Sequence, residues 1–206
     1  MNLWNKFNAD VEAARDLLIV TKTALKLGEK PINGEGNVAD IGTGTGLLAF
    51  AALHLWPRAY ATASDIDPVA VGISADNAVA NGIALGRGQG QLALYTAAGV
   101  DHPAIVTRAP YDLLIANILA GPLIELAPSL CDLVEEGGTI VLAGLLKEQA
   151  EPVIAAYRAQ GMRLAERSDR GEWPTLRLRK RPSIGWKRPR RIDRFARGEA
   201  PGFGSI

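Results

Sequence analysis

Cysteine, histidine and long apolar runs are scarce in this sequence. Its 206 residues include one cysteine, Cys131, and two histidines, His54 and His102. A single cysteine excludes an internal disulfide, and these three residues lack the clustered spacing of a structural zinc site. No uninterrupted apolar run reaches the roughly 20 residues that a membrane helix needs. Charged residues at positions 10, 12, 15 and 16 fall where a signal peptide would have its uncharged apolar core. We therefore expect a cytoplasmic protein with no membrane contact.

Charge is distributed unevenly along the chain. Residues 177–206 hold ten Lys/Arg and two acidic residues, whereas residues 1–176 hold thirteen Lys/Arg and twenty acidic residues. The segment 181–206 is basic and rich in proline and glycine, a composition that does not bury enough apolar surface to fold alone. This tail is either a solvated extension, which we expect to be disordered, or a contact to phosphate groups of an RNA such as ribosomal RNA.

Hydrophobic periodicity divides the rest of the chain into a long helix and an α/β domain. A 3-4 apolar spacing that includes Trp4 and Phe7 predicts a helix over 4–27, so residues 1–36 form an N-terminal helix and linker. The domain at 37–180 has seven expected strands, at 37–41, 59–64, 91–96, 111–116, 139–145, 162–167 and 175–179. Helices are expected at 46–55, 68–81, 122–135 and 147–160, with a loop over 97–110 and Gly137-Gly138 as a helix stop. This alternation predicts a Rossmann-like, mostly parallel seven-stranded sheet with helices on both faces and an antiparallel last strand.

The stretch from Val38 to Leu48 carries the main site signal. An apolar strand ends there in three alternate glycines, Gly42, Gly44 and Gly46, and a helix pattern follows. Glycines at such a turn allow positive φ and a close approach of backbone to ligand, and the helix start offers free N–H donors. We therefore expect a ligand at this turn.

Two aspartates follow the second strand. Asp67 with Pro68 matches a helix N-cap and first helical position, which leaves Asp65 free for a ligand. An acidic residue about 20 positions after the glycines is placed to bind ribose hydroxyls at the carboxyl edge of the sheet. Asn117 ends the strand at 111–116 at the same edge, and it is either a site residue or a turn former.

The glycine pattern alone leaves two cofactor classes open. Gly44-Thr45-Gly46-Leu47-Leu48-Ala49 also satisfies a dinucleotide pattern, so a hydride-transfer dehydrogenase is one reading. Asp40 favours the other, because a carboxylate at the strand end suits a cationic sulfonium cofactor and repels a pyrophosphate. Asp40 could instead hold the glycine turn through backbone N–H groups.

Several motifs together resemble those of class I S-adenosylmethionine-dependent methyltransferases. They are Val38 to Gly46, Ala63 to Pro68, Asn77 with Asn81-Gly82, and Gly137-Gly138. More specifically, the sequence resembles the ribosomal protein L11 methyltransferase (PrmA) family in the runs Ala109 to Leu123, Leu126 to Pro128, Leu142 to Leu146, Glu148 to Ala150 and Gly171 to Leu176. The resemblance covers roughly residues 37–180, and Asn117-Ile118-Leu119-Ala120 is its most specific part.

The resemblance implies a cofactor, a reaction and a set of site residues. It implies S-adenosylmethionine as cofactor and methylation of lysine and α-amino nitrogens of a large-subunit ribosomal protein. Asn117 would lie between cofactor and acceptor amine as the catalytic residue, Asp65 would bind the ribose, and no residue stands out as a general base. The expected cofactor site comprises Asp40, Gly42, Thr43, Gly44, Gly46, Asp65, Ile66, Asn117 and, at the position of a family threonine pair, Thr21.

The chain also departs from the family pattern. Family members have a separate N-terminal substrate-binding domain, for which 206 residues leave no room, and a Gly-Thr-Gly-His-type segment that is absent here. Recognition of the ribosomal protein is then expected to be lost or to pass to another surface, such as the basic tail. The alternatives are a catalytically silent, ribosome-associated module that binds cofactor, or a methyltransferase for another amine or an RNA base. A monomer is the default expectation.

Overall fold

The structure is a computed structural model that describes residues 36–181. Its strands are β1 (Asn37–Ile41), β2 (Tyr60–Asp65), β3 (Leu92–Thr96), β4 (Tyr111–Asn117), β5 (Val134–Ala143), β6 (Met162–Arg170) and β7 (Trp173–Lys180). Its helices are α2 (Leu47–Leu55), α3 (Pro68–Ala80), α4 (Pro103–Arg108), α5 (Ala120–Glu125), α6 (Ala127–Leu133), the 3-10 turn η1 (Lys147–Gln149) and α7 (Ala150–Ala159). The helix expected over 4–27, Thr21 and the tail beyond 181 lie outside the described residues.

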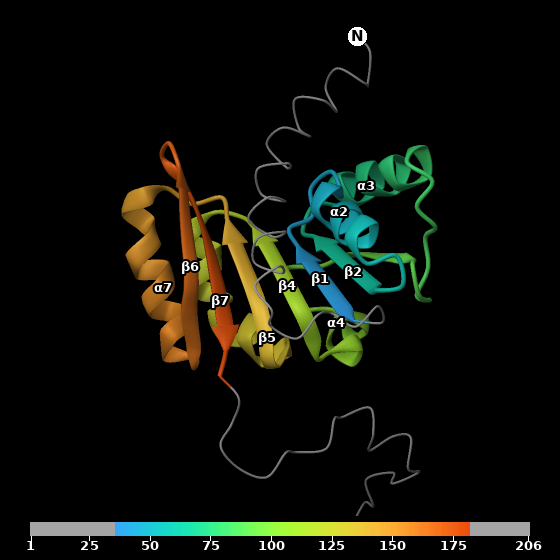
Figure 1. Cartoon of the computed structure of the whole chain (residues 1–206). Helices are drawn as coiled ribbons and strands as arrows, with labels where there is room; N and C mark the ends of the chain where they lie inside the picture. The colour runs from blue at the N-terminus through green and yellow to red at the C-terminus, as the bar shows by residue number, and fades with distance from the viewer. Residues whose placement is uncertain (1–35, 182–206) are drawn as a thin grey trace, which may run out of the picture.

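The strands form one seven-stranded sheet in the order β3-β2-β1-β4-β5-β7-β6 (Figure 1). β7 is antiparallel to β5 and β6, and the other neighbouring pairs are parallel. The predicted architecture and the antiparallel last strand are confirmed. The strand order reverses between β1 and β4, and ligands of open α/β sheets bind at the carboxyl ends of the strands beside such a reversal.

Helices cover both faces of the sheet, as predicted (Figure 1). The larger core lies between β4, β5 and β7 and the helices α5, α6 and α7, with Leu114, Leu142, Leu176 and Tyr157 fully buried. Smaller clusters on the opposite face join α2 and α3 to β1, β2 and β3. Among residues 36–181 no helix has the length and apolar character to cross a membrane.

One expected loop and one expected helix differ from the sequence predictions. The expected loop at 97–110 contains α4, because Pro103 occupies the first turn and the His102 side chain accepts a hydrogen bond from the Ala104 N–H as N-cap. The single helix expected over 122–135 is two helices that meet at Leu126, since Pro128 lies in the first turn of the second helix.

The predicted helix stop at Gly137-Gly138 is wrong. Both glycines lie inside β5, which begins at Val134, directly after α6. The register with β4 shifts between Tyr111 and Leu113, and Gly137 has a φ of 75°. A Cβ on Gly138 would lie 2.8 Å from both the Glu135 carbonyl oxygen and the Val134 side chain, so the glycines permit an irregular strand rather than end a helix.

Candidate functional site

The three glycines after β1 have different local roles. All have positive φ: 76° at Gly42, 56° at Gly44 and 87° at Gly46. A Cβ on Gly42 would lie 2.2 Å from the Ile118 side chain, and one on Gly46 would lie 2.4 Å from the Phe50 ring. A Cβ on Gly44 would meet none of the described residues within 4 Å. Gly42 and Gly46 are therefore required by packing, and Gly44 borders open space at the tip of the turn.

Asp40 fixes the glycine turn from below. Its side chain is completely buried, and its Oδ2 accepts hydrogen bonds from the Thr43 hydroxyl at 2.8 Å and the Ala49 N–H at 3.2 Å. Its Oδ1 is buried and has no hydrogen-bond partner among the residues that the structure describes. Burial raises the pKa of Asp40 to about 6. These bonds show that Asp40 and the buried Thr43 hold the glycine turn in place. Direct contact of either residue with a cofactor stays a prediction.

Asp65 lies at the end of β2 and bridges two loops. One carboxylate oxygen accepts from the Gly44 N–H at 2.9 Å, and the other accepts from the Asp67 N–H at 3.0 Å. The predicted cap is confirmed, since the Asp67 side chain accepts from the Val69 N–H. Asp65 does not cap α3 but already accepts two backbone bonds, and its contact with a ligand stays a prediction. The adjacent Ile66 is 71% exposed, an unusual degree of exposure for an isoleucine beside a glycine turn.

Two side chains of α3 hold the glycine turn from the outside. The buried Ser74 hydroxyl donates to the Gly44 carbonyl at 2.8 Å, and the Asn77 side-chain amide donates to the Thr45 carbonyl at 3.0 Å. Sequence reasoning placed Asn77 in a motif without a role and did not single out Ser74. Their spacing of three residues, one helical turn, is the signal that could have found them.

Asn117 lies at the carboxyl end of β4, on the same edge of the sheet as the glycine turn. Its side chain is exposed and, within residues 36–181, has no hydrogen-bond partner. Its Oδ1 is 3.0 Å from where a Cβ of Gly144 would lie, just after β5. The next residue, Ile118, covers Gly42, so the segment after β4 packs directly against the glycine turn. The structure thus brings Asn117, Gly42 and Asp65 to one edge, as the sequence predicts.

Comparisons of this chain with a family model and with known proteins point to the same family. The model of the ribosomal protein L11 methyltransferase (PrmA) family matches residues 19–181. A ribosomal protein L11 methyltransferase of Brucella suis is 40% identical over 161 residues, which are 77% of this chain and 54% of that protein. A protein of the same name from Rhizobium meliloti is 42% identical over 142 residues, which are 69% of this chain and 47% of that protein.

A solved structure supports the same similarity. The crystal structure of a ribosomal protein L11 methylase from Lactobacillus delbrueckii subsp. bulgaricus has a TM-score of 0.67 and 27% sequence identity, over 80% of this chain and 77% of that chain. The chain spans about half the length of the curated relatives it matches.

Proposed function

The chain belongs to the ribosomal protein L11 methyltransferase (PrmA) family, and we propose that it binds S-adenosylmethionine and transfers a methyl group to amino groups of that ribosomal protein. Family membership supports the cofactor and the reaction over a hydride-transfer dehydrogenase. Because the chain spans about half of its curated relatives, the activity and the acceptor are part of this proposal.

The glycine turn has the features that a sulfonium cofactor requires. Open space beside Gly44 would leave room for a ligand against the backbone, and Asp40 and Ser74 hold the surrounding turn through hydrogen bonds. Asp65 would bind the ribose hydroxyls, and the exposed Ile66 would pack against the base. When bound, the cofactor supplies an electrophilic methyl carbon on its sulfonium sulfur, and the acceptor amine supplies the electron pair.

The acceptor amine has to arrive unprotonated and aligned. Asn117 is exposed at the edge where β4 ends, and its side-chain carbonyl can accept a hydrogen bond from the amine and orient its lone pair. Asp40 is no candidate for a general base at the acceptor, because its carboxylate is completely buried under the turn. Positioning and removal of water from the amine would therefore supply most of the rate enhancement.

A single observation carries the proposal. Open space at Gly44, the carboxylate of Asp65 and the exposed amide of Asn117 lie at the edge where the strand order reverses. A cofactor bound at the turn would therefore lie next to an acceptor amine at Asn117, as methyl transfer requires.

The test is methyl transfer to purified ribosomal protein L11, followed by mass spectrometry of the acceptor. The wild-type chain is expected to add methyl groups, and Asn117→Ala to slow transfer about 100-fold through loss of alignment. Gln160→Ala, an exposed amide at the end of α7, is the matched control and should leave the rate unchanged.

The outcome also separates the alternatives. Cofactor binding with no methylated product would identify a catalytically silent module and contradict the proposal. A mass shift on another amine or on RNA, with L11 unmodified, would replace the acceptor and keep the reaction.

A further inference from the structure

The β6–β7 hairpin reaches the same edge of the sheet as the candidate site. β7 is antiparallel to β5, and β6 is antiparallel to β7, so β6 runs in the direction of β4 and β5. The turn at residues 171–172 therefore lies at the carboxyl edge, where β4 ends in Asn117 (Figure 1). The motif Gly171 to Leu176, which carried part of the family resemblance, forms this turn and the start of β7.

Strand alternation places Trp173 and Asn117 on the same face of the sheet. Leu176 of β7 and Ala116 of β4 both belong to the core under α7. Because side chains alternate along a strand, Trp173 and Asn117 point to the opposite face. Both are exposed, and Trp173 is 58% exposed.

The register aligns the two residues across the strands between them. Asn117 is opposite Ala143 of β5, and Leu142 is opposite Leu176 of β7, so Thr175 falls opposite Ala143. Trp173 is two residues nearer the turn than Thr175. With strands about 4.8 Å apart and a rise of about 3.4 Å per residue, the Cα atoms of Asn117 and Trp173 are roughly 12 Å apart. The Asn117 Oδ1 already leans toward β5, the strand between them.

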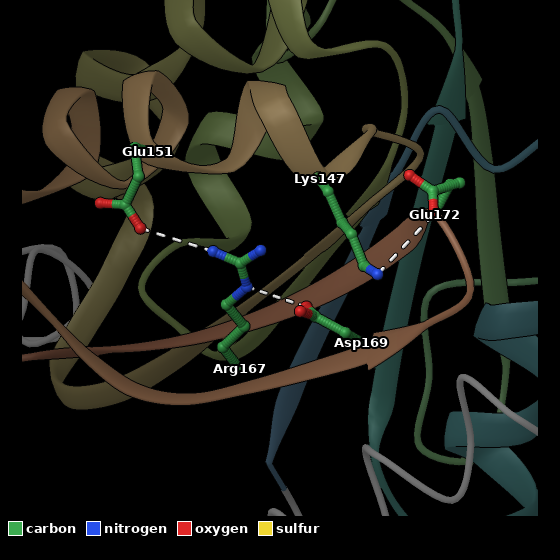
Figure 2. A network of polar contacts seen from close by, with 5 residues as sticks. All are labelled: Lys147, Glu151, Arg167, Asp169 and Glu172. Atoms are coloured by element: carbon green, nitrogen blue, oxygen red, sulfur yellow. Dashed lines mark hydrogen bonds and ion pairs between the residues drawn. The ribbon is translucent and has the colours of Figure 1, made fainter.

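Contacts from Lys147 and along β6 hold the turn of the hairpin in place. The Lys147 N–H donates to the Glu172 carbonyl at 3.0 Å, and the Lys147 ammonium lies 3.7 Å from the Glu172 carboxylate. On β6, Arg167 pairs with Asp169 at 2.8 Å and with Glu151 of α7 at 3.4 Å (Figure 2). Exposed ion pairs contribute little singly, so the backbone bond from Lys147 is the main restraint on the turn.

We infer that Trp173 is a specificity-determining residue that forms the outer wall of the acceptor site and contacts the alkyl chain of the residue that carries the incoming amine. An indole ring offers a broad apolar face against which a flexible methylene chain packs well. Leu119, 72% exposed two residues after Asn117, adds apolar surface at the same edge. Lys147 is a positioning residue, because it acts through Glu172 and the hairpin turn. This inference rests on the proposed function and assigns its acceptor side.

The experiment measures binding of purified ribosomal protein L11 to the chain saturated with S-adenosylhomocysteine, which prevents turnover. Trp173→Ala is expected to weaken L11 binding about tenfold, through loss of the apolar contact between the indole ring and this alkyl chain. Val79→Ala, which truncates another exposed apolar side chain, on α3, is the matched control and should not change binding. Affinity for S-adenosylhomocysteine should stay the same in both variants.

Lys147 provides a second, independent readout. Lys147→Ala should raise the KM for L11 about twofold to threefold with kcat unchanged, and Lys147→Arg should restore it, as expected for an exposed ion pair. Equal L11 binding by wild type and Trp173→Ala would overturn the inference and leave the proposed function intact. Failure of the wild-type chain to bind L11 at all would overturn the proposed acceptor and, with it, this inference.

Discussion

The glycine turn and the β6–β7 hairpin lie at one edge of the sheet but are held in different ways. Side chains of β1, β2 and α3 bind the turn, and two of them, Asp40 and Ser74, are buried. The hairpin turn is held by one backbone bond and by exposed ion pairs (Figure 2). The proposed cofactor side is thus held by buried hydrogen-bonding groups, whereas the proposed acceptor side is exposed and weakly restrained among residues 36–181.

This difference fits the two proposed ligands. A small cofactor gains affinity from a rigid turn, because no ordering free energy is lost on binding. A protein acceptor with several target amines needs a surface that can bind polypeptide segments in more than one orientation. Variants of the turn should therefore affect stability and cofactor binding together, and variants of the hairpin should affect only the acceptor.

The largest expected effect compares two glycines of the turn. Gly46→Ala should lower the free energy of unfolding by about 3 kcal/mol, because a Cβ would overlap the Phe50 ring at positive φ. Gly44→Ala, with open space at its Cβ, should lower it by only about 1 kcal/mol yet still weaken cofactor binding. Urea unfolding measures both. Equal losses of stability would contradict the distinction between a packing glycine and a ligand-facing one.

Asp65 should determine cofactor affinity. Asp65→Ala removes a carboxylate proposed to bind two ribose hydroxyls, so we expect affinity for S-adenosylmethionine to fall about 100-fold. Titration calorimetry measures it, with Asp76→Ala on the exposed side of α3 as the control. An Asp65→Ala variant that binds within threefold of wild type would remove Asp65 from the site.

The smallest effect is a pH dependence that comes from Asp40. Its pKa rises from 3.8 in the unfolded chain to about 6 in the folded one, because the carboxyl is buried. The folded state therefore retains this proton over a window in which the unfolded state has lost it. The stability that Asp40 contributes falls as pH rises from about 4 to about 6, by about 2 kcal/mol.

Asp40→Asn lacks this titration and serves as the reference. The unfolding free energy of wild type minus that of Asp40→Asn should fall across the same pH window, measured by urea unfolding at each pH. A difference that stays constant from pH 4 to 6 would show that the buried carboxyl titrates normally.

Local signals predicted much of the fold. Asp67-Pro68 marked the start of α3, and the apolar runs marked the strands, because capping and alternation are encoded by near neighbours. The same logic could have found α4 from His102-Pro103, where histidine takes the cap position. The prediction for Gly137-Gly138 is wrong, because a glycine pair can either end a helix or permit an irregular strand. The sequence is the same in both cases, and the pairing of β5 with β4 decides between them.

The candidate site was predictable in position but not in its internal bonds. Asp65 and Asn117 follow strands, and parallel topology alone brings strand ends together. The bonds between Gly44 and Asp65 and between Gly44 and Ser74 join residues 21 and 30 positions apart. The pairing of β1 with β2 creates the first bond, and the packing of α3 against the turn creates the second. The place of Trp173 on the face of Asn117 likewise depends on the β5–β7 register.

Calorimetric titration of the chain with S-adenosylmethionine and, separately, with NADH tests the central claim most directly. The preformed glycine turn with Asp40 beneath it and Asp65 beside it predicts saturable binding of S-adenosylmethionine and none of NADH. Saturable binding of NADH, with no heat from S-adenosylmethionine, would contradict the account.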